Sequence, residues 1–136
     1  MRVVPDTNIL ISGTLWDGSV AQKVLYHFVE TDVEIFSTGA ILAEMERVLL
    51  TEFEYSKEKI DYIIGKVSLF LKLIEPKRKI VVVKDDPDDD KVIECAAEIA
   101  ADYILSYDNH LLKLKEFEGI KIVKPEVFLH ALRQKK

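Results

Sequence analysis

Acidic side chains at separate places along the chain have the types and positions that could bind a divalent cation. Asp6 interrupts the apolar run of residues 3–11, and Asp108 directly follows the apolar run of residues 103–106. A carboxylate at the end of a buried strand loses hydration, so it needs a partner there. In open parallel sheets ligands lie beyond the carboxyl ends of the strands. Both aspartates are therefore expected at one edge of a sheet.

A dense group of acids lies between these two positions, at Asp85, Asp86, Asp88, Asp89 and Asp90 around Pro87. An aspartate before a proline is typical of a helix N-cap, and further acids in the first turn favour the positive end of the helix dipole. That accounts for two or three of them. The remaining negative charge would be repelled unless a cation or a base screens it. Asp108 likewise has a structural alternative, as the N-cap of a helix beginning near Asn109.

A glutamate from the helix that contains residues 41–49 is the fourth candidate. At about 100° per residue, Glu44 falls at one edge of the apolar stripe of this helix and Glu46 at the other. Helical geometry does not choose between them, and either could be a solvated flanking residue.

Oxygen ligands without Cys or His favour Mg²⁺ or Mn²⁺. Two such ions about 3.5–4 Å apart can activate water and stabilise the leaving oxygen of a phosphodiester. His27, His110 and His130 have no metal-ligand spacing and are expected to be ordinary surface or core residues. If the acids converge, the chemistry they favour is hydrolysis without a covalent nucleophile.

The elements that must position these acids alternate between strand and helix, which predicts an α/β fold with a mostly parallel sheet between helical layers. The most strand-like segment is Lys79–Val83. Expected strands are residues 3–11, 33–36, 79–83, 103–106 and 120–123; expected helices are residues 19–31, 41–49, 56–75, 92–100, 109–114 and 125–132.

The 136 residues are expected to form a single domain, 1–136, because the chain is long enough to bury a core and has no linker. It has 49% apolar and 32% charged residues and no apolar run long enough to span a membrane. The N-terminus lacks the pattern of a signal peptide. Cys95 is alone, which favours a reducing cytoplasm.

The net charge of −5 argues at first against a nucleic-acid partner. Basic residues nevertheless cluster at 77–79, at Lys113 with Lys115, and at 133–136. An acidic centre with basic patches around it suits a metal-dependent enzyme acting on a phosphodiester, although ordinary solvated charge gives the same composition.

Four ordered segments resemble the PIN domain family, in particular its small prokaryotic toxin-type ribonucleases. They are Asp6-Thr7-Asn8, residues 41–45, residues 86–91 with Ala96 downstream, and residues 101–108 leading into Leu111-Leu112. Each is weak alone, but together they cover nearly the whole chain in the right order. The resemblance implies a three-layer α/β/α sandwich and metal-dependent cleavage of RNA.

The resemblance also implies which residues form the site. The acidic quartet of the family would fall on Asp6, Glu44, Asp90 and Asp108, as catalytic residues and as ligands of Mg²⁺ or Mn²⁺. Its polar helpers would fall on Asn8 or Thr7, and on Ser106. Asp90 is chosen by counting back from Asp108, and Asp89 or Asp86 could share or take its role. Arg47 or Lys91 would offset phosphate charge at the rim.

The partners that the resemblance implies are an RNA substrate, a small antitoxin protein and a second copy of the chain. The apolar stripe expected on the helix of residues 56–75 would suit a homodimer, although core packing explains it as well. Two other functions compete with the ribonuclease: a non-catalytic module that binds RNA or protein, and a metal-dependent DNA nuclease. The complete acidic quartet argues against the first, and the lack of long insertions against the second.

Overall fold

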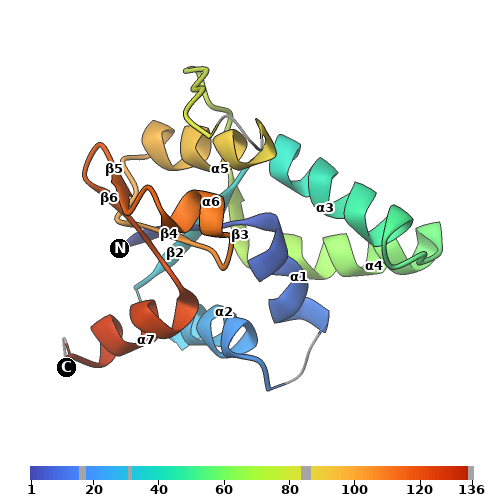
Figure 1. Ribbon diagram of the computed structural model, residues 1–136. Helices are drawn as coiled ribbons and strands as arrows, with labels where there is room; N and C mark the ends of the chain where they lie inside the picture. Colours follow the sequence, from blue (N-terminus) through green and yellow to red (C-terminus); the bar gives the residue numbers. More distant parts are fainter. Residues whose placement is uncertain (16–17, 31, 84–86, 135–136) are drawn as a thin grey trace.

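The computed structural model describes residues 1–15, 18–30, 32–83 and 87–134, which form a six-stranded sheet with helices on both faces (Figure 1). The strands are β1 (Arg2–Pro5), β2 (Glu34–Ser37), β3 (Leu71–Leu73), β4 (Tyr103–Leu105), β5 (Glu116–Phe117) and β6 (Ile120–Val123). Their order is β3-β2-β1-β4-β6-β5, and only the β5–β6 pair is antiparallel. The helices are α1 (Thr7–Leu15), α2 (Val20–Glu30), α3 (Gly39–Thr51), α4 (Lys57–Ser68), α5 (Pro87–Glu98), α6 (Asn109–Leu112) and α7 (Pro125–Gln134).

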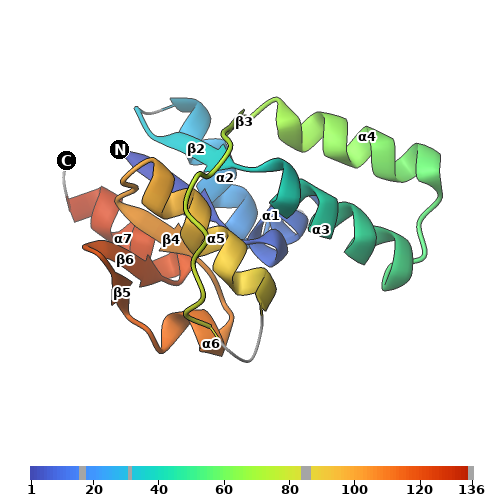
Figure 2. The same cartoon turned by 90° about the horizontal axis from the view of Figure 1, so that it is seen from above.

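Alternating side chains of the strands divide the core between the two faces of the sheet. Val3 belongs to a cluster with residues of α2 and with Phe128 of α7. Val4 faces the opposite way, into a cluster built from α3, α4 and α5. Figures 1 and 2 show these two groups of helices on opposite sides of the sheet. The predicted three-layer α/β/α sandwich with a mostly parallel sheet is confirmed. Within the described ranges, none of the helices combines the length and apolar character needed to cross a bilayer.

The expected first strand is in fact a strand followed by a helix. β1 ends at Pro5 and α1 begins at Thr7, so the apolar residues 9–11 belong to α1. The backbone N–H of Ile9 donates to Asp6 Oδ1 at 2.9 Å, and that of Leu10 donates to the Asp6 carbonyl oxygen at 3.2 Å. Asp6 therefore caps the helix, and its carboxylate is fixed at the junction of the two elements.

The prediction of one helix over residues 56–75 is wrong at its C-terminal end. α4 ends at Ser68, and residues 71–73 pair in parallel with residues 35–37 of β2. The apolar residues after Ser68 continue the helical spacing, but β2 offers an open edge with backbone hydrogen bonds to be made. This long-range pairing overrides the local periodicity.

The prediction that residues 79–83 form a strand is also wrong. The N–H of Ile80 donates to Glu94 Oε2 at 2.8 Å, and those of Val82 and Val83 donate to Asp90 Oδ1 at 2.9 and 2.8 Å. Carboxylates of α5 thus take the place of a neighbouring strand. In Figure 2 the segment crosses over α5. Ile80 and Val83 are still buried in the core, which explains the apolar composition.

The other expected elements are confirmed within a few residues as β2, β4, β6, α2, α3, α5, α6 and α7. The short antiparallel strand β5 was not expected. Asp85 and Asp86 lie outside the described residues.

Close packing of α1 on α2 requires a glycine at position 13. A Cβ added to Gly13 would lie 2.1 Å from Cδ1 and 3.0 Å from Cγ of the buried Leu25. We expect Gly13→Ala to lower the unfolding free energy by about 1–3 kcal/mol, because Leu25 must leave its rotamer or the helices must separate. Gly65→Ala is the matched control, since a Cβ on Gly65 of α4 meets nothing within 4 Å. Denaturation that finds Gly13→Ala as stable as Gly65→Ala would contradict this account.

Candidate active site

The site lies where the order of the sheet reverses. β1 pairs with β2 on one side and with β4 on the other, and the chain reaches β4 only after completing β2 and β3. Asp6 follows β1, while Ser106 and Asp108 follow β4, so all three lie beyond the carboxyl ends of adjacent parallel strands. Such a reversal is the usual position of ligands in open α/β sheets.

A small cavity at this edge, the acidic pocket, has a volume of about 40 Å³. Its lining residues come from four separate parts of the chain: Asp6, Thr7, Asn8, Glu44, Asp89, Val92 and Asp108. The sheet edge and the starts of α1, α3 and α5 thus bring four carboxylates to one place. Asp6 and Asp89 are only 5% and 8% exposed. Little water is available to screen their charges from one another.

Ser106 links the two aspartates that follow the strands. Its hydroxyl donates to Asp6 Oδ2, and its Oγ accepts the backbone N–H of Asp108 at 2.9 Å. Ser106 is fully buried, so it is shielded from competing water. The residue implied as a polar helper therefore holds Asp6 and Asp108 in fixed relative positions.

The pKa of Asp6 is raised from 3.8 to about 6 in total, and burial is the largest cause. The negative charges of Asp108 and Glu44 contribute to this increase in the pKa, whereas the hydrogen bonds from Ser106 and Ile9 oppose it. The ionised form of Asp6 is thus disfavoured in the protein alone. A bound cation would reverse this effect.

Among the side chains of the acid run that the structure describes, Asp89 lines the acidic pocket and Asp90 does not. Asp90 Oδ1 accepts the backbone N–H groups of Val82 and Val83, and Asp90 lines a different cavity together with Lys79 and Glu94. Neighbouring side chains on a helix point about 100° apart, which explains how Asp89 and Asp90 come to line different cavities. The structure thus brings together Asp6, Glu44 and Asp108 of the implied quartet, with Asp89 in the place expected for Asp90.

Glu44 and Glu46, which helical spacing alone could not separate, lie in different environments. Glu44 is half-buried and lines the acidic pocket, whereas Glu46 is exposed. The start of α3 fixes this orientation, because Thr38 follows β2 and its Oγ1 accepts the N–H of Ile41 at 3.1 Å.

His110 is a candidate that the sequence did not identify. Donor atoms of Asp89, Asp108 and His110 all lie within 4.8 Å of one another, a spacing that suits a shared metal ion. Asp108 is the N-cap of α6 and accepts the N–H of His110 at 2.7 Å, while His110 Nδ1 lies 3.5 Å from the same oxygen. Asp108 is therefore the N-cap of α6 and also a lining residue of the acidic pocket. The sequence feature that could have identified His110 is the N-cap at Asp108, because a hydrogen bond to the cap fixes the residue two positions later.

The acidic pocket also contains a hydroxyl that fits a cation. Thr7 Oγ1 is buried, and no hydrogen-bond partner for it exists among the described residues. Such an atom is rare in a folded protein unless water or an ion satisfies it. A neutral oxygen on a residue that shares a pocket with four carboxylates suits a hard divalent ion, which prefers oxygen ligands.

Lys91, one of the two basic residues expected at the rim, has other surroundings. Lys91 lines two neighbouring cavities beside Glu94 but does not line the acidic pocket. Arg78 of the basic cluster at 77–79 forms two hydrogen bonds to the Glu118 carboxylate, at 2.9 and 2.8 Å. Neither Lys91 nor Arg78 is among the residues that line the acidic pocket.

Comparison with solved structures finds the same fold in distant proteins. VapBC2 from Rickettsia felis, solved bound to a DNA fragment from its promoter, is 14% identical with a TM-score of 0.67, and the match covers 90% of this chain and 97% of that one. PAE2754 from Pyrobaculum aerophilum is 16% identical with a TM-score of 0.64, and the match covers 98% of this chain and 90% of that one.

No curated protein sequence matches the chain, but a protein-family model does. The model is described as a PIN domain, and it matches residues 2–110. These residues include Asp6, Glu44, Asp89, Asp108 and His110. Because the match spans most of the chain and agrees with the fold, the protein belongs to the PIN domain family.

Proposed function

We propose that the protein is a metal-dependent endoribonuclease that hydrolyses RNA phosphodiester bonds. The observation that carries this proposal is that Asp6, Glu44, Asp89 and Asp108 line one pocket together with Thr7, whose hydroxyl is buried and has no hydrogen-bond partner among the described residues. Membership of the PIN domain family supports nuclease chemistry. The sequence resemblance to small toxin-type members supports RNA, rather than DNA, as the substrate.

Asp6, Asp89 and Asp108 would hold Mg²⁺ or Mn²⁺, with Thr7 Oγ1 as a neutral ligand or as a partner of a bound water. His110 is near enough to Asp89 and Asp108 to contribute a nitrogen ligand. An imidazole is softer than a carboxylate, so its participation would favour Mn²⁺ over Mg²⁺. When bound, the ion would lower the pKa of water and stabilise the charge on the phosphate oxygens.

The protein's own groups would orient the reactants. Ser106 donates a hydrogen bond to the Asp6 carboxylate and accepts one from the backbone N–H of Asp108, so it fixes the two residues relative to each other. Glu44, half-buried at the side of the acidic pocket, would accept a hydrogen bond from the attacking water and fix its direction. The hydrogen bonds from Val82 and Val83 to Asp90 would hold the start of α5, and with it Asp89.

From the family resemblance we also propose that the protein binds a small antitoxin and forms a homodimer. Core packing accounts for Ile60, Ile63 and Val67 of α4, which are buried. Leu69 and Leu73, at 83% and 54% exposed, are the apolar residues that a homodimer would cover near the β3 edge. Light scattering at high concentration tests this part, and a monomer would contradict it.

The nuclease proposal predicts that labelled single-stranded RNA is cut with Mg²⁺ or Mn²⁺ and left intact with EDTA. Glu44→Gln should reduce the cleavage rate by about 10²-fold, because the water loses its orienting carboxylate. Glu46→Gln is the matched control on the same helix and should cleave as the wild type does. Cleavage that persists in EDTA would remove the metal-based mechanism, and preferential cutting of single-stranded DNA would favour the DNA nuclease.

A further inference from the structure

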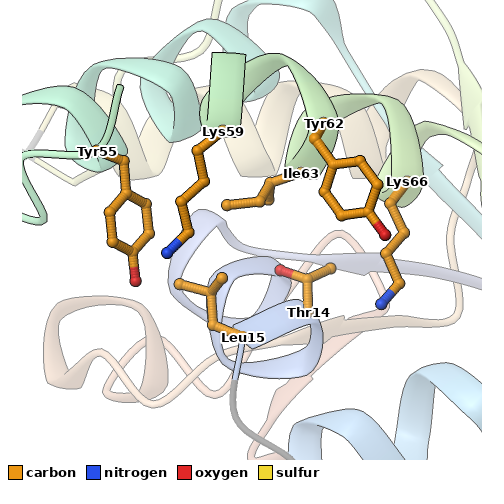
Figure 3. A pocket seen from close by; sticks show the side chains of 7 residues that line it. All are labelled: Thr14, Leu15, Tyr55, Lys59, Tyr62, Ile63 and Lys66. Atoms are coloured by element: carbon orange, nitrogen blue, oxygen red, sulfur yellow. The ribbon is translucent and has the colours of Figure 1, made fainter. Parts of the chain in front are cut away.

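A groove between α1 and α4, the α1–α4 groove, lies outside the acidic pocket. Its volume is about 300 Å³, and its lining residues are Thr14, Leu15, Tyr55, Lys59, Tyr62, Ile63 and Lys66. Figure 3 shows Lys59, Tyr62 and Lys66 extending from α4 toward α1. The groove thus combines an apolar floor with aromatic rings and ammonium groups.

Helical spacing explains how α4 builds one wall of this groove. Residues 59, 62, 63 and 66 follow the i, i+3, i+4, i+7 pattern that places side chains on one face of a helix. Ile63 is buried and joins this face to the core, whereas Tyr62 is 71% exposed. A tyrosine this exposed contributes little to the core, so its ring is available to a ligand.

The charge of the groove favours an anion. Lys59 and Lys66 line it, and no acidic side chain does so among the residues that the structure describes. Lys59 Nζ lies 3.8 Å from the centroid of the Tyr55 ring, which holds this positive charge beside an aromatic surface. This local charge contrasts with the net charge of −5 of the whole chain.

Helix α1 connects the groove to the acidic pocket. It begins at Thr7, which lines the pocket, and Thr14 and Leu15 at its other end line the groove. The rise of an α-helix places Thr7 and Thr14 about 10 Å apart along the axis. A few nucleotides of an extended strand can bridge this distance.

We propose that the α1–α4 groove is a binding site for single-stranded RNA, in which a base stacks on Tyr62 and phosphates contact Lys59 and Lys66. The inference rests on the proposed function, because it extends the same substrate away from the acidic pocket. Stacking on exposed aromatic rings next to basic side chains is a general way to bind unpaired nucleotides. An acidic protein segment would use the lysines but would leave the flat face of Tyr62 without a matching group.

The test measures binding apart from cleavage, by fluorescence anisotropy of a labelled single-stranded RNA of about a dozen nucleotides in EDTA. Tyr62→Ala should weaken binding by about ten-fold, and Tyr62→Phe should restore it because the ring is kept. Lys66→Gln should weaken binding and reduce the slope of log K against log salt by about 0.7. Lys57→Gln, also exposed on α4 but outside the groove, is the matched control.

Equal affinity for RNA in the wild type, Tyr62→Ala and Lys66→Gln would overturn the inference, and so would groove variants that lose only the binding of an acidic peptide. If the wild type cleaves RNA and the groove variants have the same affinity and KM, the proposed function would stand. The groove would then not be an RNA-binding site. If the wild type binds RNA through Tyr62 and Lys66 but cleaves nothing, the groove would stand and the proposed nuclease function would be removed. Raised KM with unchanged kcat in Tyr62→Ala would support both.

Discussion

Asp89→Asn is expected to lower metal-dependent RNA cleavage by about two orders of magnitude or more while the protein remains folded. Asp89 lines the acidic pocket with Asp6, Glu44 and Asp108, so the substitution removes a carboxylate charge from the position proposed for the cation. Asn has nearly the same shape, which keeps the packing at the start of α5. Cleavage rates at several Mn²⁺ concentrations, with circular dichroism as a check of the fold, measure this effect.

Asp90 provides the matched comparison because it is the next residue and is equally buried. Its oxygen accepts two backbone N–H groups, from Val82 and Val83. Asp90→Ala should therefore reduce the unfolding free energy by about 2–3 kcal/mol, since two donors lose a charged acceptor. Asp90→Asn keeps an acceptor oxygen and should cost less. If Asp90→Asn abolished cleavage while Asp89→Asn did not, the proposed roles of the two residues would have to be exchanged.

Asp6→Asn is expected to stabilise the metal-free protein at neutral pH and to destroy its activity. Burial, with Asp108 and Glu44, raises the pKa of Asp6 to about 6, against 3.8 for an unperturbed aspartate. Below about pH 4 Asp6 is protonated in both folded and unfolded protein and has no effect on stability. Between about pH 4 and 6 only the folded state keeps the proton, so stability falls as pH rises. Above about pH 6 the full penalty is present.

The difference of about two pH units corresponds to at most about 3 kcal/mol, and the lost acceptor for the Ser106 hydroxyl reduces what the variant gains. Chemical denaturation in EDTA at pH 4 and pH 8 should show the advantage of Asp6→Asn only at the higher pH. Adding Mn²⁺ should raise the melting temperature of the wild type and leave the variant unchanged. Asp61→Asn, on the exposed surface of α4, should show neither effect.

If Asp6→Asn proved less stable than the wild type by the same amount at both pH values, the hydrogen bonds of Asp6 would outweigh the charge repulsion. The conclusion that the ionised form of Asp6 is disfavoured when no cation is bound would then be wrong. If Asp6→Asn instead gains stability and loses cleavage, the charges of the acidic pocket lower the stability of the protein but are needed for its activity.

Sequence patterns predicted the sandwich because they reflect burial, which depends on local residue types. The runs that became β2, β4 and β6 are flanked on both sides by helical periodicity, and only a parallel sheet between helices buries both. The secondary-structure predictions were wrong where backbone groups found hydrogen-bond partners far away in the sequence. Residues 71–73 joined the open edge of β2. Ile80 donates its N–H to Glu94, and Val82 and Val83 donate theirs to Asp90.

For the candidate site, too, local features could be predicted from the sequence, whereas contacts between distant segments could not. The sequence by itself determined that Asp6 and Asp108 lie at the ends of strand-like apolar segments, because that position is a local property. The tertiary structure decided that these strands, β1 and β4, are neighbours in the sheet. Only the tertiary structure decided that Asp89 rather than Asp90, and Glu44 rather than Glu46, face the acidic pocket, and that His110 lies beside them. The physical reason is rotation: one residue along a helix turns a side chain by about 100°, and what it then meets depends on how that helix packs against the rest of the molecule.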